Sequence, residues 1–533
     1  MVYKRIIFYF YTFVKNLQVK TYLLFNLILL LNLSVNAQFI DPKKILQESI
    51  KKNKVEKQTK KDTVEKFSTL KKQIKEITGD STLKNASISF YAYDLKSKEV
   101  IAEHNADVSL IPASSQKIIV TAAALEYFGA NYRFKTTIEH DGSIDASGTL
   151  NGNIYIKGGG DPALGSPIFK NHYKENAFLK TWADSIAKKG IKKINGRIIG
   201  DAEIFDDQTP VNWIWGDMGN YYGATAYGIS IFDNQFKVIF DTGKEKDSVK
   251  IKEHIPNIPY LKLSNQVKTY SGTEDLCYFT GGPFENERTV LGYLPKDKKN
   301  FSVRASIPDP PLFLAYLLKA QLDSINIQCT ELPCTIRQLK STDKYKESIK
   351  IQICETLSPS LSEIVFATNK YSHNLFAETL LKHIGLRSYK NTETATAANA
   401  LKDFCKQRKI DTQGMFLSDG SGLSRYNSLT AKQLVGVLLY MKRSKSYYAF
   451  YNSLPAAGLS GTIRSMFKNT TAEKNLRAKS GYMSRVRSYA GYVTTKSNRD
   501  VAFAIIVNNY TVSDARMKEM IEMVLVKLAD MQE

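Results

Sequence analysis

Apolar and polar side chains begin to alternate along the chain near Asn85. Residues 86–95 (ASISFYAYDL) show the period of two that a half-buried strand requires, and residues 96–105 (KSKEVIAEHN) continue it as a predicted hairpin. Apolar side chains then recur at helical spacing up to Phe128, after Pro112 marks a helix start. We therefore predict a two-stranded hairpin followed by an apolar helix.

The pattern changes in the middle of the chain. From Tyr132 to about Lys350, short strand-like pieces are separated by turns of Gly, Pro and Asn. Helical patterns return after Leu357, and the chain closes with two strand-like segments and a helix from Asp514 to Met531. The segments before and after this middle region therefore share one pattern of strands and helices, and the middle region differs from both.

Length and composition agree with more than one structural region. The 533 residues exceed the roughly 100 to 200 of a usual domain, and 43% of them are hydrophobic, which excludes a disordered or fibrous protein. We predict an α/β (α+β) fold in which a discontinuous domain, residues 79–130 and 346–533, is interrupted by a β-rich inserted region. This region, residues 131–345, is long enough for one or two subdomains.

The first 37 residues predict secretion. Two lysines precede an apolar run from Tyr22 to Leu33, and a small-residue exit follows that ends at Ala37. We expect residues 1–37 to be a cleaved signal peptide and the mature protein to be periplasmic. An uncleaved membrane anchor is the alternative, because a second apolar stretch runs from Ile6 to Val14.

Residues 38–78 are predicted to form an exposed basic tether. From Asp41 to Glu76 there are twelve lysines against six acidic residues, which supplies six of the +22 net charges. A solvated spacer is the simpler interpretation, and peripheral attraction to anionic wall polymer or membrane is the functional one. Basic residues there do not alternate with aromatic side chains on a fold, so we do not expect nucleic acid as a partner.

Five cysteines are too few for a disulfide scaffold and lack the spacing of a zinc site. In an oxidising compartment Cys329 and Cys334 could pair across a short loop, and five buried thiols are the alternative. The six histidines contain no HExxH pair. We therefore expect neither a metal nor a cofactor.

Candidate chemistry starts at Ser114. A serine three residues before a lysine at a helix start places both side chains on one face, where the amine can take the hydroxyl proton. The spacing is a weak signal alone, since this lysine-rich chain repeats it elsewhere, for example at Ser465. The Pro-Ala entry and the apolar helix after Lys117 distinguish this copy.

Two further motifs complete a serine acyl-transfer constellation in the expected order. The first is YSHN, in which Ser372 and Asn374 offer a hydroxyl and an amide before a predicted helix. The second is AKSG, in which Lys479 and Ser480 offer a cation and a hydroxyl, and Gly481 allows close backbone approach. Each motif is more often a helix cap or a turn, but the three together favour a catalytic site.

Four more segments extend these motifs: IKGGGDPAL (156–164), WIWGDM (213–218), SDGSGLSRYN (418–427) and LPAAGLSGT (454–462). With them, the chain after Asn85 resembles the penicillin-binding D-alanyl-D-alanine carboxypeptidase/endopeptidases of the penicillin-binding protein 4 type. The resemblance implies a transpeptidase/β-lactamase-like domain with an antiparallel sheet and helices. It also implies a large insertion, which fits the distance between Ser114 and Ser372.

The resemblance implies a two-step reaction on peptidoglycan stem peptides, with β-lactam antibiotics as covalent inhibitors. Ser114, deprotonated by Lys117, would attack the penultimate D-alanine, release the terminal D-alanine and leave an acyl-enzyme for water. Ser372 would assist proton transfer and Asn374 would hold the substrate amide. Lys479 would bind the terminal carboxylate.

The same resemblance assigns the binding residues. Ser480 would share the carboxylate, while the amides of Ser114 and Tyr482 would form an oxyanion hole beside Gly481. The positions that match the family's pocket for a diaminopimelate side chain are Asp217, Tyr222, Arg425, Met483 and Ser484.

Three positions depart from the family pattern or carry no role in it. The third motif has a serine where a threonine is usual, Tyr482 is bulkier than the usual residue, and His373 is expected to be an exposed bystander. These departures keep alternatives open: a non-catalytic peptidoglycan-binding or β-lactam-sensing protein on the same scaffold, or a β-lactam-hydrolysing enzyme.

Overall fold

The computed structural model of the protein describes residues 67–532. The predicted signal peptide and the tether up to residue 66 lie outside these residues. Helix α3 (Ser68–Thr78) is the first helix of the described residues and precedes Asn85, where the alternating pattern starts. Leu70, Ile74 and Ile77 are buried on one face of α3, an amphipathic stripe that the dense lysines obscured in the sequence.

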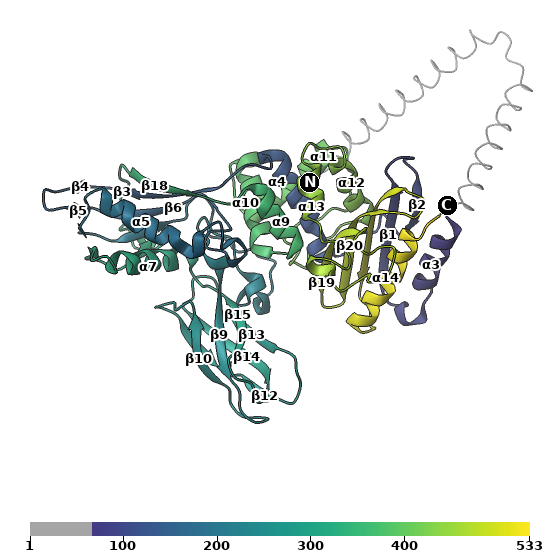
Figure 1. The fold of residues 1–533 in the computed structure, drawn as a ribbon, viewed down its shortest axis with the longest axis horizontal. Coiled ribbons are helices and arrows are strands. Elements are labelled where there is room, and N and C mark those ends of the chain that lie inside the picture. The colour runs from purple at the N-terminus through teal and green to yellow at the C-terminus, as the bar shows by residue number, and fades with distance from the viewer. Residues whose placement is uncertain (1–66, 533) are drawn as a thin grey trace, which may run out of the picture. The chain divides into compact units, whose positions relative to one another are not determined.

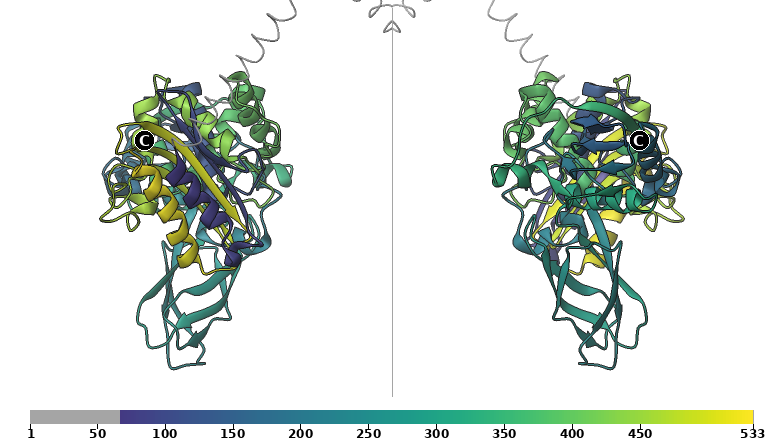
Figure 2. Two further views of the ribbon diagram at one scale, coloured as in Figure 1. Left: turned by 90° about the vertical axis from the view of Figure 1, so that its right-hand side faces the viewer. Right: turned by 90° about the vertical axis from the view of Figure 1, so that its left-hand side faces the viewer.

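One antiparallel sheet is built from both ends of the chain (Figure 1). Its strand order is β19-β20-β21-β1-β2, and each neighbouring pair is antiparallel. Figure 2 shows, in its left view, the purple strands of the first end beside the yellow strands of the second. The bounds are β1 (Ser87–Asp94), β2 (Val100–His104), β19 (Arg477–Met483), β20 (Val486–Thr494) and β21 (Asp500–Asn508).

The predicted hairpin is confirmed, because β1 and β2 pair around the turn at residues 95–99. The central strand β21 is a nearly continuous apolar run, which is typical of a strand buried on both faces. Helix α12 (Ala431–Met441) packs on β21, β1 and β20, and helix α14 (Asp514–Ala529) packs on β20. Helices from the C-terminal half of the chain therefore cover the sheet.

The predicted apolar helix is also confirmed. It consists of a 3-10 turn, η2 (Ala113–Gln116), and helix α4 (Lys117–Phe128), whose residues 117–125 are all buried. Helices α9 (Leu361–Lys370), α10 (Asn374–Tyr389) and α12 pack around it. Two further helices, α11 (Thr394–Gln407) and α13 (Tyr447–Ser453), contact α4 from the same group. The SxxK segment thus lies at the centre of the helical layer.

The inserted region begins with a second five-stranded sheet. Its order is β17-β8-β6-β3-β18, in which β18 pairs antiparallel with β3. The predicted boundary at residue 346 had assigned β18 to the flanking domain, but its pairing with β3 places it in the inserted sheet. The bounds are β3 (Lys135–His140), β6 (Ile154–Gly158), β8 (Ile198–Asp201), β17 (Cys334–Thr335) and β18 (Ile351–Leu357).

The rest of the inserted region contains helices as well as strands. Helices α5 (Ala177–Lys188), α7 (Pro310–Asp323) and α8 (Ile336–Ser341) accompany a small sheet of order β16-β7-β5-β4. The small sheet comprises β4 (Ser143–Ile144), β5 (Thr149–Asn151), β7 (Lys193–Ile194) and β16 (Gln328–Cys329). Two more sheets, of order β10-β9-β15 and β11-β14-β12 with β13 on β14, form the lower part of Figure 1.

Those two sheets contain β9 (Gln235–Asp241), β10 (Lys250–Ile255), β11 (Lys262–Asn265), β12 (Lys268–Tyr270), β13 (Leu276–Thr280), β14 (Glu287–Pro295) and β15 (Phe301–Ser306). Short helical turns precede these strands in the chain. They are α6 (Trp215–Met218), η5 (Tyr221–Gly223) and η6 (Phe232–Asn234).

The cysteine pair considered in the sequence does not form. Cys329 lies in β16 and Cys334 in β17, which belong to different sheets, and all five cysteines are free thiols. The guanidinium of Arg197 donates to Cys334 Sγ at 3.8 Å instead. Within residues 67–532, none of the helices is long and apolar enough to cross a membrane.

Candidate active site

Ser114 and Lys117 meet at the junction of η2 and α4. The Lys117 Nζ lies 2.9 Å from Ser114 Oγ, because three residues of tight helical turn bring the two side chains to one face. The amine also donates to Asn374 Oδ1 at 2.7 Å and to the Ser421 carbonyl at 2.6 Å. One serine, one lysine and one amide are therefore in direct contact.

The Lys117 amine is completely buried. Burial lowers its pKa from 10.5 to about 7, although the negative charges of Asp419 and Glu378 oppose the shift. A substantial fraction of the amine is therefore neutral near pH 7. In that state its lone pair can accept the Ser114 hydroxyl proton over the observed distance.

The second motif occupies the turn between α9 and α10. Ser372 has a left-handed backbone (φ 58°), and its Oγ accepts a hydrogen bond from Lys479 Nζ at 2.9 Å. Asn374 is the first residue of α10, so its side chain projects beside the turn. Its Nδ2 donates to the Tyr222 carbonyl of the inserted region at 2.8 Å. Asn374 therefore connects Lys117 to the inserted region.

The third motif lies on the edge strand β19. Lys479 is fully buried, and burial together with the nearby charge of Lys117 lowers its pKa well below the usual range. The Lys479 amine also donates to the Ser480 carbonyl at 2.7 Å. The Ser480 hydroxyl donates to Thr462 Oγ1 at 2.7 Å, so the altered KSG motif keeps an ordered hydroxyl at the cleft.

Two glycines let backbone segments close on Ser114. A Cβ at Gly481 would lie 2.4 Å from the Pro112 carbonyl oxygen and 3.0 Å from the Ser114 nitrogen. A Cβ at Gly422, which has φ 80°, would lie 2.0 Å from the Ala113 carbonyl oxygen. The nucleophile's backbone is therefore held between β19 and the segment 418–424 at distances that no other residue type permits.

A buried acid from α10 supports Lys117, and the sequence analysis did not single it out. Glu378 lies one helical turn after Asn374, and its Oε1 accepts from the amides of Gly420 (3.1 Å) and Ser421 (2.7 Å). Burial and the neighbouring Asp419 raise its pKa to about 7. Glu378 thereby fixes the segment whose carbonyl accepts from Lys117.

Asp419 is the second such acid. It accepts from the amides of Gly422 (2.8 Å) and Ser424 (2.6 Å), and from the Trp213 indole nitrogen at 2.9 Å. Trp213 is buried, as expected for a core residue. Asp419 belongs to the segment SDGSGLSRYN, which is one of those that carry the family resemblance. Only the fold shows that this segment packs on the backbone at Ser114.

The motifs open into one cleft of about 1020 Å³. Ser114, Ser372, Asn374 and Ser480 line it, while Lys117 and Lys479 lie buried beneath and Gly481 is buried in β19. The residues assigned to substrate binding line the same cleft: Tyr482, Asp217, Tyr222, Arg425, Met483 and Ser484. The fold therefore gathers residues that are up to 370 positions apart around Ser114.

The cleft offers charges of both signs, with Asp217 from the inserted region and Arg425 from the segment 418–427. Burial raises the pKa of Asp217, and a hydrogen bond from Tyr222 and the charge of Arg425 act in the opposite direction. Burial and the Asp217 charge raise the pKa of the Tyr222 hydroxyl. A carboxylate beside a guanidinium suits a zwitterionic group.

His373 is not the exposed bystander that the sequence analysis expected. Its side chain is only 11% exposed, lines the cleft, and stacks on Phe376 with ring centroids 3.9 Å apart. The tight turn before α10 directs it toward Asp233 of the inserted region, with Nε2 3.5 Å from Asp233 Oδ2. The motif pattern alone could not show this contact.

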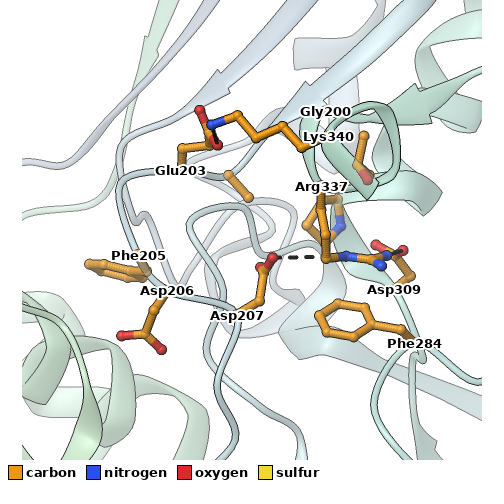
Figure 3. Close-up of a pocket in the computed structure, with 12 residues that line it drawn as sticks. Gly200, Glu203, Phe205, Asp206, Asp207, Phe284, Asp309, Arg337 and Lys340 are labelled. Atoms are coloured by element: carbon orange, nitrogen blue, oxygen red, sulfur yellow. Dashed lines mark hydrogen bonds and ion pairs between the residues drawn. The ribbon is translucent and has the colours of Figure 1, made fainter. Parts of the chain in front are cut away.

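A second cavity, of about 280 Å³, lies within the inserted region (Figure 3). Arg337 crosses it, with Asp309 at 2.6 Å and Asp207 at 3.8 Å, and packs over the Phe284 ring. Lys340 pairs with Glu203 at the rim. None of its lining residues lines the cleft at Ser114, and its charged side chains are largely paired with one another.

The chain is similar in sequence to known D-alanyl-D-alanine carboxypeptidases and in fold to a penicillin binding protein. The chain is 26% identical to D-alanyl-D-alanine carboxypeptidase DacB of Haemophilus influenzae over 442 residues, 81% of this chain and 88% of the relative. It is 27% identical to D-alanyl-D-alanine carboxypeptidase of Actinomadura sp. over 470 residues, 84% of this chain and 82% of the relative. The crystal structure of penicillin binding protein 4 from H. influenzae matches with a TM-score of 0.72 at 24% identity, over 84% of this chain and 98% of that one.

The fold is therefore that of the transpeptidase/β-lactamase-like proteins, as the resemblance implied. Residues 70–531 match the D-Ala-D-Ala carboxypeptidase 3 (S13) family. The chain belongs to this family.

Proposed function

We propose that the chain is a serine D,D-peptidase that cleaves D-alanyl-D-alanine in peptidoglycan stem peptides through an acyl-enzyme on Ser114. The observation that carries the proposal is the 2.9 Å contact between Ser114 Oγ and a buried Lys117 amine whose pKa is about 7. The family match supports the substrate class. Secretion after loss of residues 1–37 and action in the periplasm are part of the same proposal.

In the first step, Ser114 Oγ attacks the carbonyl carbon of the penultimate D-alanine, and its proton passes to Lys117 Nζ. The amides of Ser114 and Tyr482 stabilise the oxyanion. The bond to the terminal D-alanine nitrogen then breaks, and the proton that Lys117 took up passes to this nitrogen through Ser372 Oγ, which Lys479 orients at 2.9 Å. Lys117 is thereby neutral again. The acyl group remains on Ser114 as an ester.

In the second step, water attacks the ester and gives a proton to the Lys117 amine. The second tetrahedral intermediate collapses, the proton returns to Ser114 Oγ, and the shortened peptide leaves. Glu378 and Asp419 keep the Ser421 carbonyl on Lys117 in both steps, so the amine does not need to move between them.

Binding is assigned to the walls of the cleft. Asn374 holds the substrate amide, and Ser480 with Lys479 takes the terminal carboxylate. Asp217, Tyr222, Arg425, Met483 and Ser484 would hold the side chain of the third stem residue. A D-alanyl-diaminopimelate cross-link would present the same carboxylate, so endopeptidase activity is included in the proposal.

β-Lactams are proposed to acylate the same serine. A second crystal structure of the H. influenzae protein is described as complexed with a β-lactam, which supports this inhibitor class. The fixed amides and buried lysines that serve the peptide carbonyl would serve a strained lactam carbonyl equally.

The deciding experiment measures the intact mass of the protein after incubation with benzylpenicillin. We expect a covalent adduct in the wild type and none in Ser114→Ala. Ser465→Ala is the matched control, because Ser465 starts another SxxK sequence and is exposed, so its loss should leave the adduct unchanged. Release of D-alanine from a disaccharide-pentapeptide then tests the peptidase step.

A folded wild-type protein without adduct or D-alanine release would contradict the proposal. Binding to isolated cell wall in that case would favour the non-catalytic alternative on the same scaffold. Fast and complete loss of the adduct would instead indicate β-lactam hydrolysis.

A further inference from the structure

We propose that His373 and Asp233 form a positioning pair through which the inserted region holds Ser372 in its reactive geometry. The pair rests on the proposed function, because it acts through Ser372. His373 lies between Ser372 and Asn374, and its Nε2 is 3.5 Å from Asp233 Oδ2. Both side chains line the cleft yet are about nine-tenths buried, with 11% and 8% exposed.

The turn that carries Ser372 needs an external restraint. Ser372 has φ 58°, a left-handed conformation that a serine adopts only at a cost. The His373 amide donates to the Thr368 carbonyl at 3.0 Å, which ties the turn to the end of α9. The Tyr371 amide donates to the Ala367 carbonyl at 3.0 Å and the Ala377 amide to the His373 carbonyl at 3.3 Å, so the turn is tied to both helices. The His373 side chain adds a contact with the inserted region that these backbone bonds do not supply.

Asp233 is presented from a rigid element of the inserted region. Phe232, Asp233 and Asn234 are all left-handed, with φ between 52° and 58°. The Asn234 side chain fixes them by accepting from the Ile231 amide at 3.0 Å and donating to the Thr225 carbonyl at 2.9 Å. The Asp233 carboxylate therefore has a preset position before any substrate binds.

Aromatic packing fixes the other side of the imidazole. The His373 ring is nearly parallel to Phe376 (21°), with centroids 3.9 Å apart, and Phe376 in turn stacks on Phe169 of the inserted region at 6.1 Å. The imidazole is thus confined between an aromatic face and a carboxylate. Motion of its backbone, and with it Ser372 Oγ, is restricted.

Neither side chain has its full set of hydrogen-bond partners in this buried position. Asp233 Oδ1 and His373 Nδ1 are buried atoms without a hydrogen-bond partner. Among the described residues, His373 is the basic side chain within 4.0 Å of Asp233, so its loss would leave this buried side chain without that polar neighbour. The two side chains should therefore behave as one energetic unit.

Another bridge between α10 and the inserted region provides a matched control. Lys382 Nζ lies 2.8 Å from Asp206 Oδ1, two turns along α10 and outside the cleft. Removal of this bridge weakens the docking of α10 without touching the Ser372 turn. It separates a general structural effect from a positioning effect.

The test is a double-variant cycle on the second-order rate of acylation by benzylpenicillin, followed by intact mass. We expect His373→Ala and Asp233→Asn each to lower the rate about tenfold, and the double variant to be within about twofold of either single variant. For D-alanine release, kcat should fall while KM stays within about twofold. Lys382→Met should lower the melting temperature and leave acylation within about twofold.

Additive losses in the double variant, or wild-type acylation in both single variants, would overturn the pair. If His373→Ala does not fold, His373→Gln retains a hydrogen-bonding side chain of similar reach and enters the same cycle. If the wild type itself is not acylated, the proposed function fails independently, and amide hydrogen exchange of residues 371–374 tests the pair. Asp233→Asn should then accelerate exchange there, and unchanged exchange would contradict the proposal.

Discussion

Lys117 shows how location changes the chemistry of a single residue. An exposed lysine is a cation at neutral pH, but burial at the start of α4 lowers the pKa of this amine to about 7. The three acceptors around it fix its direction, and the acids behind it keep the pKa from falling further. The residue can therefore act as a base without a histidine.

The rate of acylation by benzylpenicillin should follow this titration. Only the neutral amine accepts the Ser114 proton, so the rate should rise about tenfold per pH unit below pH 7 and level off above about pH 8. Rates from intact mass between pH 5.5 and 9 would show the curve. Lys117→Arg, which stays charged, should abolish acylation. A rate independent of pH in this range would exclude Lys117 as the base.

Glu378→Gln should move the midpoint of the same curve to lower pH. The Glu378 charge raises the pKa of Lys117, so its removal favours the neutral amine at a lower pH. The Gln amide oxygen can still accept from Gly420 and Ser421, as Oε1 does now. The exposed Glu393→Gln is the control. A midpoint that stays or rises would show that Glu378 does not act on Lys117.

The residues proposed as catalytic could be singled out in the sequence because their spacing is local. Ser114 and Lys117 lie within one turn, and Ser372 and Asn374 within three residues, so the sequence alone places each pair on one face. The two acids could not be found this way, because Glu378 contacts a segment 42 residues away. His373 was misjudged for the same reason, since its partner comes from the inserted region.

At the scale of elements, the site depends on how closely β19 approaches η2. The approach needs a glycine at position 481, because a Cβ there would meet Ser488 Oγ at 2.2 Å and the Pro112 carbonyl oxygen at 2.4 Å. Strand β19 is an edge strand, so its position is set by pairing with β20 on one side and by this contact on the other. The glycine thereby determines the width of the cleft.

Gly481→Ala should therefore widen the cleft. We expect acylation by benzylpenicillin to fall at least a hundredfold and the free energy of unfolding to fall by about 1 to 3 kcal/mol, as for other overpacked sites. Gly216→Ala is the control, because no atom lies within 4 Å of its added Cβ. Thermal unfolding and adduct formation measure the two effects. Normal acylation in Gly481→Ala would show that β19 can shift without loss of the site.

Elements with a clear period were predictable, and elements defined by pairing were not. The hairpin β1–β2 and helix α4 follow directly from periods of 2 and 3.6 residues. Strand β18 was assigned to the wrong side of the boundary, because only its partner β3 shows that it belongs to the insertion. Helix α3 was taken as part of an exposed tether, since its lysines outnumber the three apolar residues that it buries.

On the scale of the whole molecule, residues 69–533 form one compact unit despite the insertion. The chain passes between the two parts at residues 129–135 and 357–361, and α10 adds bridges such as Lys382–Asp206. Trp213 of the inserted region donates to Asp419 behind the nucleophile. We expect the insertion and the catalytic part to unfold together.

Arg337→Met tests this expectation from the far cavity. It leaves the buried Asp309 carboxylate without its guanidinium, which should cost roughly 3 kcal/mol of unfolding free energy at pH 8. Burial already raises the pKa of Asp309, and loss of Arg337 raises it further, so the deficit should grow as pH rises from 4 and shrink below it. Calorimetry should show one transition, shifted as a whole. Two separated transitions, or a deficit largest at low pH, would contradict this account.

The glycines at 422 and 481 also limit how this protein could adapt. A side chain at either position would collide with the backbone just before Ser114, at the Ala113 carbonyl for position 422 and the Pro112 carbonyl for position 481. We therefore expect variants with a new preference among peptides or antibiotics not to arise there without disturbing Ser114. Selection under changing ligands should therefore act on the outer wall of the cleft, at positions such as Arg425, Tyr482 and Met483. A mutational library sequenced before and after penicillin selection would be expected to leave both glycines invariant while the outer wall diversifies.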